Sequence, residues 1–386
     1  MKRKFNIIYI SSVLLLIGVL YFNARIIDPT RKLNRLVELN YFILVHTGEG
    51  SGDDDCTFEN VNISDEEARY NICKQALVDL AVELHNAGMK AVFQFHGGFF
   101  ELLNADDDFS FNNDIINFGH EIGMHHHTEC LKEVDPDNCS SDNPIHTWAK
   151  IGELNASEQD VVTTEQSMTR FSSIHGLLVG EGFQPISYCG WGSVSNLKDE
   201  ASDPSSNLFS YLLENEGVFA VTSTGEVPIN WEAINSQDEL NCGFPYATTP
   251  SNQYVNVHPV RFGESNLFYF DSPAFKFGDR ATDADAEKSI LNKVFDCVAY
   301  RANSPGYKDQ IFTWSATTHL HNVIDGDIEG GIYGGVDKAI SDLTTLKNHM
   351  QLKTIREKKV IVKYRTLEEI MALMENYSDY EFDLRE

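Results

Sequence analysis

Short apolar runs that suit buried strands alternate with helix-forming segments along most of this chain of 386 residues. The first strand–helix–strand unit, over residues 41–95, shows this alternation. Residues 41–45 form a continuous apolar run, a capping box at Ser64 and Glu67 begins an amphipathic helix that ends near Gly88, and residues 90–95 form a second strand. Strands joined through helices run parallel, because the crossover returns the chain to the same end of the sheet. We therefore expect an α/β fold built on a parallel sheet.

The same alternation continues to the end of the chain. Helices are expected up to residue 118, from a second capping box at Thr163 and Gln166, over residues 340–350 and from a third capping box at Thr366 and Glu369. Seven or eight strands suit a closed or nearly closed (β/α) barrel, which we expect to be seven-stranded and distorted, and in which chemistry takes place at the carboxyl ends of the strands. The further strands are expected at residues 121–124, 186–188, 218–222, 267–270, 311–314 and 360–364.

The N-terminus predicts export. A basic Lys2-Arg3-Lys4 start precedes residues 5–22, which carry no charge and suit either an uncleaved signal-anchor or a cleaved signal peptide. We favour the anchor, with residues 1–35 as cytoplasmic tail, anchor and linker. Residues 36–386 would then form the barrel in the cell envelope or on the extracellular side, with insertions near residues 129–160 and 225–258. The alternative is secretion after cleavage.

The net charge of the chain excludes one class of binding partner. The formal charge of −28 would repel DNA or RNA, so a nucleic-acid partner is excluded.

Seven cysteines in an exported chain predict disulfide bonds. Cys130 and Cys139 are the easiest pair, because a polar loop separates them. Cys297 lies in an apolar-periodic segment and is expected to remain unpaired as a small buried side chain.

The stretch GHEIGMHHHTE, residues 119–129, is the strongest candidate metal site. A divalent transition metal needs about three converging nitrogen or oxygen ligands and an open position if it is to catalyse. His125 is expected to supply one of these ligands, and Glu49, after the first strand, is expected at the same edge of the sheet. On an extended strand His127 would share a face with His125, whereas a helical turn would bring Glu129 beside it. Both alternatives stay open, and two other strand-end histidines, at positions 46 and 96, are additional candidates.

Several segments resemble the polysaccharide deacetylases, carbohydrate esterases that act on N-acetylated glycans. GHEIG followed by one residue and His125 is similar to the metal motif of this family. The segments GFQPISYCGWG, ATTHLHN and VIVKYRTLEEIMALM resemble later motifs, and the similarity spans roughly residues 40–375. The resemblance implies a barrel, Zn²⁺ as the expected metal with Glu49 and His125 among its ligands, and His319 or His321 as the acid that protonates the leaving amine. Trp191 is expected to stack on a sugar ring of the substrate.

The sequence also departs from this family. Gly48 stands where the family has its catalytic base, Glu129 stands where it has a second histidine ligand, and Gln184 replaces an arginine. Our first hypothesis is a metal-dependent hydrolase that removes acetyl groups from an N-acetylated glycan, anchored to a membrane. The alternative is a catalytically silent homologue that acts as a surface glycan- or protein-binding module. A third hypothesis is a related metal-dependent hydrolase with another substrate.

Overall fold

The structure of the protein is a computed structural model that describes part of the chain. Its described residues are 36–47, 66–96, 110–126, 175–176, 178–180, 182–183, 187–190, 220–222, 260–262, 268–270, 277–278, 283–303, 311–324, 334–351, 353–355, 358–374 and 381–382.

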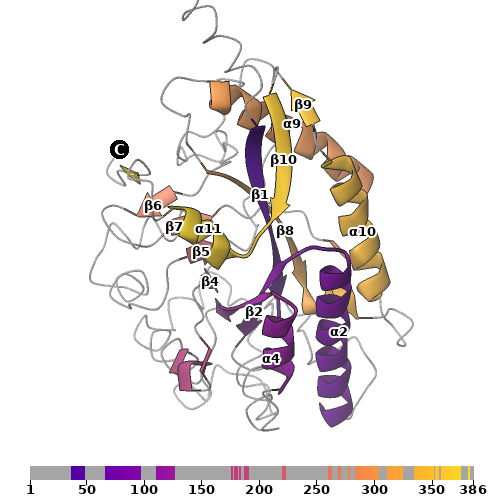
Figure 1. Ribbon diagram of the computed structural model, residues 1–386. Coiled ribbons are helices and arrows are strands. Elements are labelled where there is room, and N and C mark those ends of the chain that lie inside the picture. The colour runs from indigo at the N-terminus through magenta and orange to yellow at the C-terminus, as the bar shows by residue number, and fades with distance from the viewer. Residues whose placement is uncertain are drawn as a thin grey trace, which may run out of the picture.

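Eleven described strands form one sheet, in the order β11-β6-β7-β5-β4-β3-β2-β1-β10-β9, with β8 paired to β1 outside this path (Figure 1). All eight predicted strands are present, and β6, β9 and β11 are additional short ones. The strands are β1 (Leu36–His46), β2 (Ala91–His96), β3 (Glu121–His126), β4 (Ser187–Gly190), β5 (Ala220–Thr222), β6 (Val260–Phe262), β7 (Phe268–Phe270), β8 (Phe312–His319), β9 (Lys353–Ile355), β10 (Lys358–Tyr364) and β11 (Glu381–Phe382).

Strand β1 is the centre of the sheet. Its first half pairs with β10 and its second half pairs with β2 along one edge, while β8 runs along the other edge. These pairs are all parallel, and the antiparallel pairs are β9 with β10 and β6 with β7. The fold is therefore an α/β fold with a mainly parallel sheet, as predicted. None of the described pairings closes this sheet, so the barrel remains a prediction.

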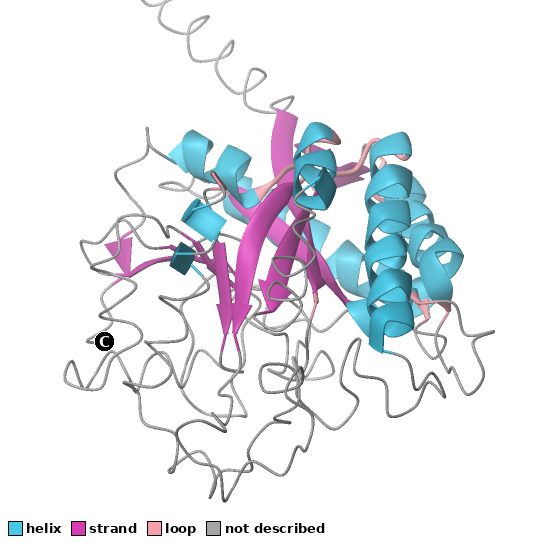
Figure 2. Cartoon of the chain, turned by 90° about the horizontal axis from the view of Figure 1, so that it is seen from below, coloured by secondary structure: helices cyan, strands magenta, loops and turns pink. Residues whose placement is uncertain are grey.

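The helices lie where the crossovers require them. Helices α2 and α10 pack against each other, and α9 packs against α10 and β1 (Figures 1 and 2). Their apolar side chains meet one face of the sheet in a large core. The helices are α2 (Glu66–Asn86), α4 (Ser110–Asn117), α9 (Ala284–Asn303), α10 (Gly335–His349) and α11 (Leu367–Met374), with a 3-10 helix η4 (Leu320–Val323) directly after β8.

Alternation along β1 gives the sheet two different faces. Tyr41, Ile43 and Val45 belong to the large core under α2, α9 and α10, whereas Phe42 and Leu44 belong to a second, smaller cluster that α11 covers. Successive residues of a strand point to opposite faces, so His46 lies on the same face as Phe42 and Leu44. We call this second face the inner face.

Local signals explain where several helices begin and end. The Thr366 hydroxyl accepts a hydrogen bond from the Glu369 amide at 3.3 Å, and the Glu369 carboxylate accepts one from the Thr366 amide at 3.2 Å. This reciprocal pair confirms the predicted capping box of α11. Helix α2 ends before Gly88, whose φ of +63° is readily adopted only by a residue without a Cβ.

One cysteine prediction was wrong. Cys297 in α9 is disulfide-bonded, as is Cys73 in α2, so Cys297 is not the unpaired cysteine. Both side chains are buried in the large core, and the apolar periodicity around Cys297 gives no sign of a bonding partner. Cys130 and Cys139 lie outside the described residues, as do both predicted insertions.

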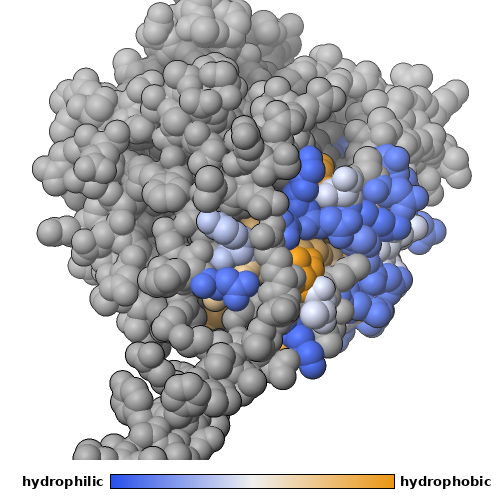
Figure 3. All heavy atoms as spheres, turned by 90° about the horizontal axis from the view of Figure 1, so that it is seen from above, coloured by the Kyte–Doolittle hydropathy of each residue, from blue (hydrophilic) through white to orange (hydrophobic). Residues whose placement is uncertain are grey.

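The described surface is largely polar. On the face shown in Figure 3 the described residues are mostly hydrophilic, with a small hydrophobic area between them. Within the described part of the chain, the large hydrophobic side chains that are exposed are Leu36, Ile116 and Val179. No helix in that part is long and apolar enough to cross a membrane, and the predicted anchor at residues 5–22 lies outside it.

Candidate functional site

Three histidines from three strands meet at the carboxyl edge of the sheet. His46 ends β1, His319 ends β8, and His125 is the last residue but one of β3. All three side chains are completely buried, with 0% of their surface exposed. Parallel strands bring their carboxyl ends to one edge, which is why residues this far apart in the sequence come together. We call His46, His125 and His319 the histidine cluster.

His46 connects the cluster. Its Nδ1 lies 3.2 Å from Nε2 of His319, with the two rings tilted by 55°. Its ring also stacks on that of His125, with centroids 4.3 Å apart and planes 20° apart. An N···N contact of this length is a hydrogen bond when one nitrogen carries the hydrogen and the other accepts it. The cluster is thus a chain of direct ring contacts that runs through His46.

The strand that carries His319 has a polar inner face. Thr313, Ser315 and Thr317 are buried and precede His319 at alternate positions, whereas Phe312 and Trp314 belong to the large core. The sequence prediction treated residues 311–314 as a plain apolar strand. The structure shows instead that hydroxyl groups line one side of β8 as it approaches the cluster.

A buried amide crosses the inner face beside the cluster. Gln94 of β2 is the register partner of His46 and is completely buried. Its Nε2 lies 3.2 Å from the Thr222 hydroxyl and 3.5 Å from the Ser187 hydroxyl, so it links β2 to β5 and β4. A Cβ on Gly123 would lie only 2.1 Å from the Ser187 Oγ, so the glycine in GHEIG leaves the space in which these groups meet.

His120, the first histidine of GHEIGMHHHTE, has a structural role. Its Nδ1 accepts a hydrogen bond from the Ala91 amide at 3.1 Å, and its Nε2 donates to the Ala81 carbonyl at 2.8 Å. Burial lowers the pKa of His120 to about 4, so the ring is neutral in this position. The ring therefore joins α2 to β2. His120 was not predicted to bind metal, and these contacts give it a structural role.

The histidine cluster does not by itself make a metal site. Imidazole nitrogens suit Zn²⁺ and other transition metals, but about three ligands must converge on one point. Across the described parts of the chain, no group of three His, Cys, Asp or Glu side chains is placed to hold an ion. The stacking of His46 on His125 contributes to this, because lone pairs in two nearly parallel ring planes do not converge. The assignment of His125 as a metal ligand therefore stays a prediction, because its predicted companions lie outside the described residues.

The other predicted site residues are placed only in part. Glu49, His127, Glu129 and Trp191 lie outside the described residues, so their roles stay predictions. His321 lies in η4, because β8 ends at His319 and the chain turns into a 3-10 helix. The extended strand that would have put the two late histidines on one face is therefore not formed.

Sequence reasoning underrated two members of this site. His46 was only an additional ligand candidate, and Gln94 was not singled out. A polar residue inside a predicted buried strand is the signal that would have found Gln94. For His46 the signal is its place directly after an apolar run whose carboxyl end faces the other strand ends.

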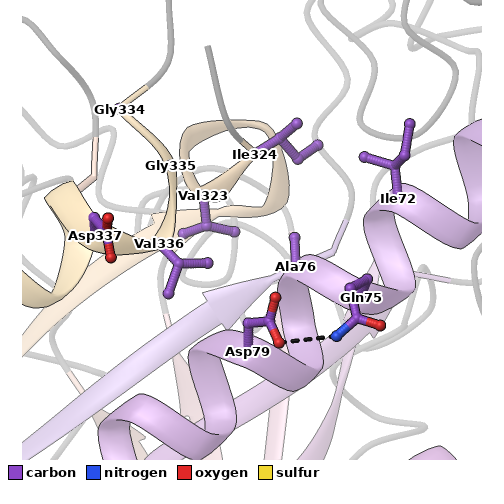
Figure 4. Close-up of a pocket in the computed structure, with 10 residues that line it drawn as sticks. All are labelled: Ile72, Gln75, Ala76, Asp79, Val323, Ile324, Gly334, Gly335, Val336 and Asp337. Atoms are coloured by element: carbon purple, nitrogen blue, oxygen red, sulfur yellow. Dashed lines mark hydrogen bonds between the residues drawn. The ribbon is translucent and has the colours of Figure 1, made fainter. Parts of the chain in front are cut away.

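A separate cavity of about 340 Å³ lies between α2, η4 and the start of α10. Figure 4 shows that its side chains come from α2 on one side and from η4 and α10 on the other. Asp79 accepts a hydrogen bond from Gln75 at 2.8 Å in its wall. None of the three clustered histidines lines it. The lining residues are Ile72, Gln75, Ala76, Asp79, Val323, Ile324, Gly334, Gly335, Val336 and Asp337.

Comparison with known proteins assigns no family to this chain. The sequence matches no family model and no curated protein. PuuE allantoinase is 11% identical, with 89% of this chain and 92% of that one covered and a TM-score of 0.44. A probable polysaccharide deacetylase from Pseudomonas aeruginosa PAO1 is 12% identical, with 92% and 94% covered and a TM-score of 0.43. The 4-alpha-glucanotransferase from Thermococcus litoralis is 9% identical, with 87% and 40% covered and a TM-score of 0.41. Similarity at this level assigns no activity to the chain.

Proposed function

We propose that this protein is a hydrolase that removes acetyl groups from an N-acetylated carbohydrate, with its active site at the histidine cluster. The observation that supports this most is the meeting of His125 and His319 on either side of His46. These two residues were assigned to separate motifs from sequence, one as a metal ligand and the other as an acid. Their meeting at one strand-end site supports a shared role in one reaction.

The side chains present suit amide hydrolysis. The reaction needs a group that gives a proton to the departing amine, and an imidazole at neutral pH can do so. His319 has this role in our proposal. The buried hydroxyls of β8 precede it on the same face of the strand. Trp191 is proposed to stack on a sugar ring.

A metal ion belongs to the proposal. We propose Zn²⁺, held by His125 together with Glu49 and either His127 or Glu129. Such an ion, when bound, supplies positive charge that polarises the acetyl carbonyl. Because nitrogen and carboxylate ligands are mixed in this set, other divalent transition metals belong in the same measurement. The site would face the outside of the cell, with residues 5–22 as a membrane anchor.

A second candidate function rests on Gly48. A chain that lacks the family's usual base at this position can keep its fold and its glycan contacts without catalysis. It would then act as a surface glycan- or protein-binding module. The two candidates differ in one measurable property, which is the release of acetate.

The test uses the purified full chain, with bound metal quantified and acetate release measured from N-acetylated chitin and peptidoglycan fragments. We expect metal-dependent release, the loss of most bound metal in His125→Ala, and the loss of turnover without loss of metal in His319→Ala. The exposed His85→Ala is the matched control and should change neither. Bound metal without acetate from any fragment would favour the silent homologue. An active enzyme that tolerates His319→Ala would refute the assigned acid.

A further inference from the structure

We infer that protonation of Glu121 controls how tightly helix α11 binds to the inner face of the sheet, so that α11 binds most tightly in acid and less tightly at neutral pH. The observation that carries this inference is a buried carboxylate in contact with the first turn of a helix. Glu121, the first residue of β3, is 7% exposed, and its Oε2 accepts a hydrogen bond from the Glu368 amide at 2.8 Å. The inference is independent of the proposed hydrolysis, because Glu121 lies at the opposite end of β3 from His125.

Helix α11 covers an apolar part of the inner face. Its Leu367, Ile370 and Met374 are buried in one cluster with side chains of β1, β2, β5 and β7, and Figure 1 shows the helix beside β5 and β7. Apolar contacts do not depend on ionisation, so they hold α11 at any pH. A pH dependence must therefore come from the polar contacts at the first turn. The sheet residues of the cluster are Phe42, Leu44, Val92, Ala220 and Phe270.

The first turn of α11 has one amide whose partner lies on another element. The first amides of an α-helix have no partner within the helix. The amides of Glu369 and Ile370 both bond to Thr366, the first to its hydroxyl at 3.3 Å and the second to its carbonyl at 3.1 Å. The Glu368 amide bonds instead to Glu121, which lies 247 positions away in the sequence. Glu121 thus links the N-terminus of α11 to β3.

Opposing effects act on the Glu121 carboxyl group. Burial raises its pKa from 4.5 to about 7, and the nearby Glu368 carboxylate adds to this increase. The Glu368 amide and the hydroxyls of Thr366 and Ser187 lower the pKa, because they donate to the ionised form. Burial has the largest effect, so the bound helix favours the protonated carboxyl group.

Other charged groups near this contact have partners of their own. Lys90, directly before β2, forms an ion pair with Glu369 of α11. Arg365, directly before α11, bonds to side chains of β1. His120 is neutral, and its ring bonds to backbone groups of α2 and β2. Of the charged side chains in the described residues, that of Glu368 therefore acts most directly on Glu121.

The direction of the pH effect follows from the two protonation equilibria. With α11 separated from the sheet, Glu121 is hydrated and has its ordinary pKa of 4.5, whereas beneath the bound helix the pKa is about 7. Below pH 4.5 the group is protonated in both states, and the contact has its full strength. Between these two values separation releases a proton, so the separated state gains up to about tenfold per pH unit. Above pH 7 the group is ionised in both states, and no further change follows.

The test measures amide hydrogen exchange in the full chain, on peptides that cover residues 367–374, at pH 5, 6, 7 and 8. Protection factors, which are corrected for the intrinsic pH dependence of exchange, report how often the helix opens. In the wild type we expect them to fall by up to about tenfold per pH unit from pH 5 to pH 7 and then to level off. In Glu121→Gln they should stay nearly constant, because glutamine does not ionise and its oxygen can still accept the Glu368 amide hydrogen bond.

Two further variants complete the test. Glu83→Gln removes an exposed carboxylate of α2 and should keep the wild-type profile. Glu368→Gln removes the like charge beside Glu121, so the protection factors should level off at a lower pH. An equal fall in the wild type and in Glu121→Gln would overturn the inference, as would a Glu368→Gln profile that levels off at the wild-type pH. If Glu121→Gln does not fold, the Glu368→Gln profile decides between these outcomes.

Discussion

Replacing Gly123 by alanine tests the packing beside the histidine cluster. The added Cβ would lie 2.1 Å from the Ser187 Oγ and 3.1 Å from both the Gln94 Cγ and the Ser187 carbonyl oxygen. No real Cβ tolerates the first distance, so the Ser187 side chain must move away from Gln94. Forcing an extra methyl group into a packed interior costs about 1–3 kcal/mol. Loss of the Gln94–Ser187 contact adds about 1 kcal/mol.

We therefore expect Gly123→Ala to lower the free energy of unfolding by about 2–4 kcal/mol. Urea unfolding followed by tryptophan fluorescence measures this, since Trp314 is buried in the core. Gly176→Ala is the matched control, because a Cβ there meets nothing within 4 Å. At a helical position that change is neutral or stabilises by up to about 1 kcal/mol.

A double-mutant cycle identifies the cause. Ser187→Ala removes the atom nearest to the new Cβ, so the double variant should be more stable than the sum of the two single changes predicts, by about 1 kcal/mol or more. The two remaining contacts at 3.1 Å prevent full recovery. Strict additivity, or a Gly123→Ala protein as stable as Gly176→Ala, would show that Gly123 does not make room for the buried amide.

Substitutions at three further positions test single features of the fold. Burial raises the pKa of Glu287 to about 8, so its contribution to stability is largest below its ordinary value of 4.5 and is lost as the pH rises towards 8. Urea unfolding between pH 5 and pH 8 should show that Glu287→Gln flattens this decline. His120→Leu should lower the free energy of unfolding by about 2–4 kcal/mol without loss of metal, because the Ala91 amide and the Ala81 carbonyl lose their hydrogen-bond partner. Asp342→Ala should lower the unfolding midpoint more than Asp342→Asn, since only alanine cannot accept the Gly278 amide hydrogen bond, which is 3.1 Å long.

The main elements could be predicted because their signals are local. The eight strand cores, the helix that ends at Gly88 and the capping box of α11 depend on residues within a few positions of one another. Short strands such as β9 and β11 have too few residues to show a period. They exist because a neighbouring strand pairs with them, which sequence spacing cannot reveal.

The first half of β1 shows why element boundaries were missed. Glu38 and Asn40 interrupt the apolar pattern, so the predicted strand began at residue 41, whereas the observed strand begins at Leu36. Asn40 is tolerated there because its amide donates to the Phe312 carbonyl at 3.0 Å and its oxygen accepts from Arg365 at 2.8 Å. Both partners lie hundreds of residues away, and a buried polar group is acceptable once such partners exist.

Those histidines of the candidate site that belong to local motifs could also be predicted from the sequence. His125 and His319 sit in short motifs with recognisable spacing, whereas the importance of His46 depends on the register between β1 and β8. That register joins residues 273 positions apart. A shift of one residue would move His46 to the other face of the sheet, among the apolar side chains under the helices.

The inner face changes from apolar to polar along the strands. Near α11 it is apolar, with Phe42, Leu44 and Phe270 in contact, and towards the carboxyl ends it carries Gln94 and His46. Buried polar groups are costly unless they are hydrogen-bonded, and Gln94 has partners on two other strands. A polar layer maintained at this cost adds no apolar burial and so contributes less to stability than an apolar one of the same size. Its position beside the histidine cluster therefore agrees better with the proposed function than with a role in stability alone.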